Sequence, residues 1–182
     1  RRTNTADSGA GSLRAALNSA NLESGSTISF NIPGAGPTFV ISPASALPTL
    51  LSPMTIDGYT QPGASPNTAA TGTNAVIKIQ IAGNSAGGGV SGLNVTGGGT
   101  TIRGLSITGF NSQGILLDVA GGNVVEGTFL GITPAGVSAG NGQNGVFSQS
   151  PSNQIGGASL AARNLLSANT GAHAGPAIRA TL

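Results

Sequence analysis

Glycine recurs along the second half of the chain at intervals that set a period for the fold. The glycines of one series each precede a short aliphatic segment and are spaced 22, 31 and 30 residues apart: Gly92, Gly114, Gly145 and Gly175. A coil of three short strands and three turns takes roughly 20–30 residues, as in solenoid repeats. We therefore predict an all-β fold, a right-handed single-stranded parallel β-helix whose coils stack as a solenoid.

A second motif repeats in the same chain: an aliphatic segment, a charged residue and then glycine. It occurs in residues 54–58, 101–107 and 123–130, and without the charge in residues 153–157. Turn-rich insertions account for the longer intervals between copies. The alternative fold is a β-sandwich, which would show more aromatic residues than the 3% found here and strand alternation at hairpin spacing.

A short helix is predicted ahead of the strands. Ser12 is a good N-cap, and an apolar face follows at helical spacing, formed by Leu13, Ala16, Leu17 and Ala20. Gly25 is expected to stop this helix. Because the end coil of a solenoid must be covered, we expect the helix to cap it.

These patterns predict one β-helix domain over residues 1–182. The strands nearest the N-terminus are expected in residues 27–32, 39–41, 54–56 and 76–81. Our division of the chain is a cap (1–26), first coils (27–90) with a long protruding loop near 58–74, regular coils (91–169) and an irregular tail (170–182).

Composition excludes several classes of function. Charged residues make up 7% of the chain with a net charge of +2, and no basic stripe with interleaved aromatics occurs, so we expect no nucleic-acid partner. The absence of cysteine excludes disulfides, thiol catalysis and cysteine-bound metals. No apolar run approaches the ~20 residues of a membrane-spanning helix. The aliphatic content within the 38% hydrophobic residues argues against disorder.

Residues 7–17, Asp-Ser-Gly-Ala-Gly-Ser-Leu-Arg-Ala-Ala-Leu, resemble the N-terminal cap motif of bacterial surface and secreted β-helix proteins of the pectate-lyase-like superfamily. Ala15 stands where that Ser-Leu-Arg motif usually has an acidic residue. The resemblance extends to about Asn169 and includes residues 30–34, 56–63, 153–157 and 162–164.

The resemblance implies a secreted or cell-surface location. Such proteins usually continue for more coils, so we expect this chain to be a fragment. A shortened solenoid would expose an apolar end, which favours self-association end to end or edge to edge.

Four charged residues form the strongest candidate site. Asp57, Lys78, Arg103 and Glu126 are spaced 21, 25 and 23 residues apart, so on successive coils they would stack outward in one column. One interpretation is a small saccharide site. The resemblance implies that an Arg or Lys would act as a lyase base and carboxylates would hold calcium. The favoured interpretation is an exposed ladder of Asp–Lys and Arg–Glu ion pairs, each worth under ~1 kcal/mol. A calcium site needs more clustered carboxylates, so we expect no cofactor.

Three further residues have side chains that could act in catalysis or ligand binding. Asp118 and Glu126 are the candidate acid and base of a glycoside hydrolase, if they lie across one turn. Tyr59 is the candidate for stacking on a sugar. His173, the single histidine, has no acid near it in sequence.

The sequence therefore predicts a non-catalytic structural or adhesive module of a secreted or surface protein. The alternative is a polysaccharide lyase, a glycoside hydrolase or a carbohydrate-binding module. The recurring asparagines near turns are interpreted as stacked amide ladders. Ice binding would need aligned threonines, and the sequence indicates no such array.

Overall fold

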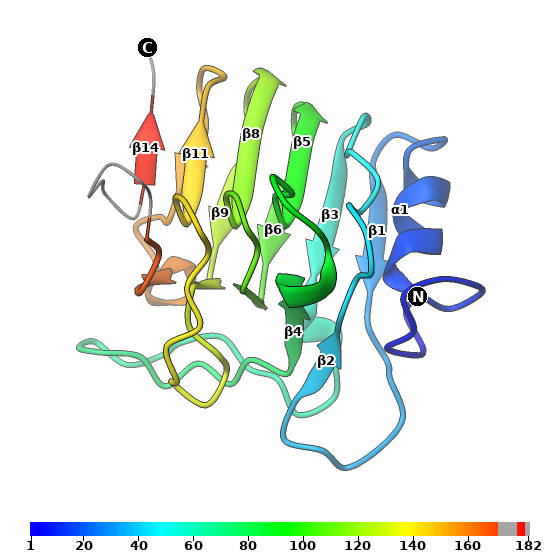
Figure 1. The fold of residues 1–182 in the computed structure, drawn as a ribbon. Coiled ribbons are helices and arrows are strands. Elements are labelled where there is room, and N and C mark those ends of the chain that lie inside the picture. Colours follow the sequence, from blue (N-terminus) through cyan, green and yellow to red (C-terminus); the bar gives the residue numbers. More distant parts are fainter. Residues whose placement is uncertain (171–177, 181–182) are drawn as a thin grey trace.

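The computed structural model describes residues 1–170 and 178–180, which form three parallel sheets and one α-helix (Figure 1). The first sheet contains, in spatial order, β1 (Ser26–Ser29), β3 (Met54–Asp57), β6 (Thr101–Arg103), β9 (Val124–Glu126) and β12 (Gln154–Ile155). The second contains β2 (Phe39–Ile41), β4 (Ile79–Ala82), β7 (Leu105–Thr108), β10 (Phe129–Leu130) and β13 (Leu165–Leu166). The third contains β5 (Leu93–Gly97), β8 (Ile115–Ala120), β11 (Val146–Ser148) and β14 (Ile178–Ala180).

The chain visits these sheets in a repeating order. From β5 onward it passes through the third, first and second sheet in turn, and each strand pairs in parallel with the strand one circuit earlier. This order is compatible with the predicted solenoid. A β-sandwich is built from antiparallel sheets, so the alternative fold is wrong.

Each repeated sequence motif supplies one sheet. The aliphatic–charge–glycine motif provides β3, β6, β9 and β12, which are consecutive neighbours in the first sheet. Gly92, Gly114 and Gly145 directly precede β5, β8 and β11 of the third sheet. Gly175 lies outside the described residues.

Aliphatic side chains of successive strands stack in register to form the core. In the first sheet Ile28, Ile56, Ile102 and Val125 are paired on neighbouring strands, and each is at most 3% exposed. Side chains alternate along a strand, so the residues between these point outward. The charged residue of the motif therefore falls on the outer surface.

The helix predicted ahead of the strands is confirmed. Helix α1 (Leu13–Ala20) begins after Ser12, whose Oγ accepts a hydrogen bond from Ala15 N at 3.2 Å. All four predicted apolar positions are buried. The helix ends at Ala20, earlier than expected, and Gly25 instead adopts φ +80° in the turn before β1. In Figure 1 α1 lies beside β1 at one end of the structure.

The long loop does not protrude freely, in contrast to the prediction. Val76 pairs with Ser65 in an isolated antiparallel bridge, so β4 begins only at Ile79. Asn67 is 1% exposed, and its Nδ2 donates to Leu160 O at 3.0 Å. The Arg163 guanidinium donates to three backbone carbonyls of the loop: Ala69, Ala70 and Gly72. The loop is therefore tied to the segment that follows β12.

Within residues 1–170 and 178–180, no helix combines the length and apolar character needed to cross a membrane.

Candidate functional site

Three of the four predicted column residues meet on the outer surface of the first sheet. Asp57, Arg103 and Glu126 occupy paired positions on β3, β6 and β9. The Arg103 Nη2 lies 2.7 Å from Asp57 Oδ2, and its Nη1 lies 3.7 Å from Glu126 Oε1. The ladder interpretation describes these contacts only in part. One guanidinium lies between two carboxylates, but Asp57 pairs with Arg103 in place of Lys78 and is only 6% exposed.

Lys78 does not belong to this column. It precedes β4 of the second sheet, and its Nζ donates to Gly36 O at 3.3 Å. The spacing of 21 and 25 residues placed Lys78 on a coil of its own, but β3 and β6 are direct neighbours. The whole segment between them, with the long loop, β4 and β5, forms one circuit, so the residue spacing did not correspond to one coil for each charged residue.

The carboxylate of Asp57 forms hydrogen bonds that stabilise the local structure. The residue is 6% exposed and caps the short 3-10 helix η1 (Gly58–Thr60), because its Oδ1 accepts from Tyr59 N at 3.0 Å. Its Oδ2 accepts from Arg103. Both carboxylate oxygens therefore have protein partners, which leaves little capacity for a metal or a substrate proton.

Arg103 is held in its charged form. The hydrogen bond to Asp57 raises the pKa of Arg103 above its ordinary value, although burial of the group opposes this. A lyase base must be neutral before it accepts a proton, so the neighbouring carboxylates disfavour that role. Its side chain remains 43% exposed.

The two residues of the second carboxylate pair, Asp118 and Glu126, lie on different sheets. Asp118 lies on β8 of the third sheet, and its Oδ1 accepts from Val119 N at 2.8 Å. Glu126 lies on β9 of the first sheet. Among the described residues, no group of three or more His, Cys, Asp or Glu side chains is placed to hold a metal ion. His173 lies outside the described residues.

The Tyr59 side chain contacts Gly104 and Gly127, in the turns that follow β6 and β9. Its hydroxyl donates to Gly127 O at 2.7 Å. A Cβ on Gly104 would lie 2.8 Å from the ring Cγ, and one on Gly127 would lie 2.6 Å from the hydroxyl oxygen. The motif glycines are therefore required by the tyrosine as well as by their positive φ of +69° and +56°. Tyr59 contributes to internal packing and does not offer a free ring.

Tyr59 should ionise well above the usual pH. Burial, followed by the charges of Asp57 and Glu126, raises its pKa from 10.0 to about 12. Because the folded-state pKa exceeds the unfolded one, the stabilisation is fully present below pH ~10 and is lost as pH rises toward ~12. The chain has one Tyr and no Trp, so phenolate absorbance reports this residue alone. The urea-unfolded chain is the control, and the same midpoint in both states would contradict the prediction.

The expected amide ladders are present. Asn123 Nδ2 donates to Asn153 Oδ1 at 2.9 Å, and Asn141 Nδ2 donates to Asn169 Oδ1 at 2.9 Å. The side-chain oxygens of Asn123 and Asn141 accept from backbone N–H groups of other turns, those of Thr100 and Phe110. These asparagines thus form hydrogen bonds with backbone groups in turns, which is a structural role.

A short threonine row exists that the sequence did not reveal. Thr27, Thr55 and Thr101 are paired on β1, β3 and β6, and the row continues as Val124 and Gln154. Three threonines beside a charged column do not make the flat array that ice binding needs.

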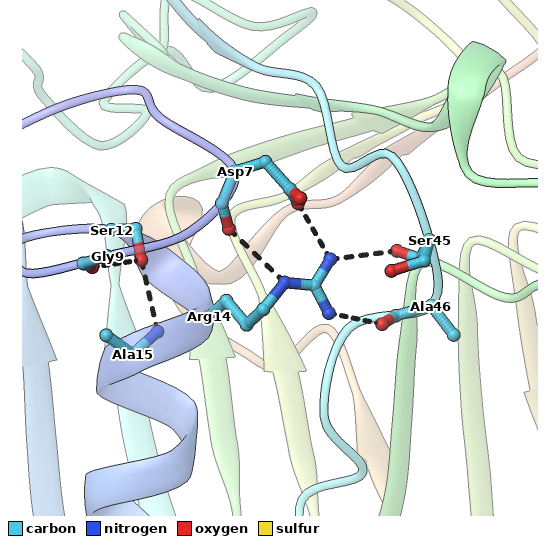
Figure 2. Close-up of polar contacts among 7 residues, drawn as sticks. All are labelled: Asp7, Gly9, Ser12, Arg14, Ala15, Ser45 and Ala46. Atoms are coloured by element: carbon cyan, nitrogen blue, oxygen red, sulfur yellow. Dashed lines mark hydrogen bonds and ion pairs between the residues drawn. The ribbon is translucent and has the colours of Figure 1, made fainter.

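The cap motif has a defined geometry, shown in Figure 2. The Arg14 Nη2 pairs with Asp7 Oδ1 at 2.7 Å, and the same guanidinium donates to the carbonyls of Ser45 and Ala46 at 3.1 and 2.6 Å. The pairing lowers the pKa of Asp7. Ser12 begins the helix, the next residue enters the core, and Arg14 fixes the helix to a distant segment. Each residue of Ser-Leu-Arg therefore has a structural role.

The long-range contacts of Arg14 and Arg163 were not predicted from the sequence, although Arg14 belongs to the cap motif. Both guanidiniums bind backbone carbonyls far along the chain, and no local spacing rule anticipates such contacts.

Comparisons with protein-family models, with curated proteins and with solved structures found no match for this chain.

Proposed function

We propose that this chain is part of a non-catalytic structural or adhesive module, a right-handed parallel β-helix of the pectate-lyase-like kind. The observation that carries the proposal is how its charged groups are used. Asp57, Arg103 and Glu126 bind one another, while Arg14 and Arg163 hold distant segments through backbone carbonyls. An enzyme would keep at least one acid or base uncommitted and facing substrate.

Incubation of the purified chain with acidic and neutral polysaccharides tests this proposal. Pectate, alginate and neutral glucans would be supplied with calcium and with a chelator. We expect no unsaturated products by ultraviolet absorbance and no new reducing ends. Cleavage that is lost in Arg103→Met would instead support a lyase, and cleavage lost in Glu126→Gln a hydrolase.

The alternative, a carbohydrate-binding module, has one observation in its favour. Phe147 faces outward on β11, in register with Leu116 on β8, and Arg179 lies 5.2 Å from its ring centroid. An aromatic ring beside a cation is a surface on which a sugar could stack. Binding on a glycan array that Phe147→Ala abolishes would favour this alternative.

Location and association belong to the same proposal. We propose a secreted or bacterial cell-surface protein that self-associates through sheet edges, since β12, β13 and β14 are the last strands of their sheets in the described part of the chain. Light scattering over a range of concentrations tests association, and a constant monomer mass would contradict it.

A further inference from the structure

A small cavity lies between α1 and β1, at the end of the stack that the helix covers. Its volume is about 150 Å³. Its polar lining consists of Arg1, Arg2, Ser19, Glu23, Ser26 and Thr27. A cavity of this size exceeds the ~30 Å³ that one water occupies in the liquid, so it can admit a small polyatomic ligand.

Arg2 is fixed at this cavity by its backbone. Its N donates to Ser29 O at 2.6 Å and its carbonyl accepts from Asn31 N at 2.8 Å, so it pairs with Phe30 beyond the end of β1. The residue is only 9% exposed. Its Nη1 donates to Ser12 O, but its buried Nε has no hydrogen-bond partner in the described part of the chain.

The charge of Arg2 is also uncompensated. Among the described residues, its guanidinium forms no ion pair within 4.0 Å, whereas Arg103 has two carboxylates beside it. Burial accordingly lowers the pKa of Arg2, while Asp57 raises that of Arg103. A buried cation without a counter-charge is costly, and a bound anion would lower that cost. Arg1 lines the same cavity and adds a second positive charge.

We propose that this cavity binds a small oxyanion, a carboxylate or a sulfate, with Arg2 as its principal ligand and Arg1 as a second cation. A guanidinium forms charge-assisted hydrogen bonds with such oxygens, here through N–H groups other than Nε, which is shielded from solvent. Ser26 and Thr27 line the same cavity, and the Ser26 hydroxyl donates to Glu23 O at 2.8 Å. Glu23 also lines it but is exposed to solvent, so its charge is screened. The site is separate from the charged column of the first sheet.

Thermal unfolding in different sodium salts at matched ionic strength tests this site. With acetate or sulfate in place of chloride, we expect a saturable rise in Tm of about 2–4 °C once the anion is about fivefold above its Kd. In Arg2→Met the rise should vanish, because the apolar side chain keeps the volume without the charge. Arg163→Met is the matched control. It removes a guanidinium that binds loop carbonyls and does not line this cavity, so the anion-dependent rise should remain.

The readout is the difference between the chain and Arg2→Met, since sulfate also stabilises proteins in general. An equal rise in both would overturn the proposal, as would no saturable rise in either. On the unsubstituted chain, NMR gives a second measurement that no folding defect can confuse: the Arg2 Nε–H resonance should shift on titration with acetate. A stationary resonance would overturn the proposal. A short uronic-acid oligomer, titrated in parallel, shows whether the site also takes a carboxylate carried on a larger molecule.

Discussion

Leu17→Ala is expected to lower the free energy of unfolding by about 2–5 kcal/mol. Leu17 is 0% exposed and lies on the face of α1 that covers the first coil. Alanine would lose the buried methyl groups and leave a cavity at the end of the core, where the helix cannot collapse inward because Arg14 ties it to Ser45 and Ala46. Urea unfolding followed by circular dichroism measures the change.

Leu22→Ala is the matched control for this substitution. Leu22 follows the helix and is 86% exposed, so its truncation should alter stability by no more than about 0.5 kcal/mol. If the two variants unfolded at the same urea concentration, the helix would not be contributing to the core as described.

Asn141→Ala should cost about 2–4 kcal/mol. Asn141 is 0% exposed. Its side chain accepts from Phe110 N at 3.1 Å and donates to Ile107 O at 3.2 Å and to Asn169 Oδ1 at 2.9 Å. Alanine would leave the Phe110 N–H without an acceptor in a buried turn, and that unmade bond is the largest part of the expected cost.

Asn18→Ala provides the comparison. Asn18 is an exposed residue in α1, where alanine is the better helix former, so this variant should be neutral or slightly more stable. Equal destabilisation of both variants would contradict a structural role for the amide ladder. Differential scanning calorimetry on the three proteins decides between these outcomes.

The sequence predicted those parts of the fold that depend on short-range pattern. The glycine series and the charged motif each repeat once per circuit, so they identified strands of the third and first sheets. The N-cap and apolar spacing identified α1 for the same reason. In the second sheet, β7 and β10 follow the motif glycine, whereas β2 and β4 follow turns and loops of other lengths, so the pairing of these strands came only from the structure.

The candidate site was predictable only in part. Asp57, Arg103 and Glu126 share a column because each occupies the same position of a repeated motif. Lys78 lies outside that motif, at the end of a long loop. Its distance in residues from Asp57 therefore did not predict which sheet it lies beside. The packing of Tyr59 on Gly127 and the burial of Arg2 depend on contacts between distant segments. Local sequence patterns do not predict such contacts.

The anchored loop after η1 has a consequence for how this stack comes apart. In a stack of repeated layers, each layer touches only its neighbours, so the ends can fray while the middle stays folded. Here the loop leaves the layer of β3 and is held by Asn67 and Arg163 at the layer that follows β12. Loss of that far layer must also release the loop. The connection therefore couples layers that do not touch, and it favours cooperative unfolding over gradual loss from one end.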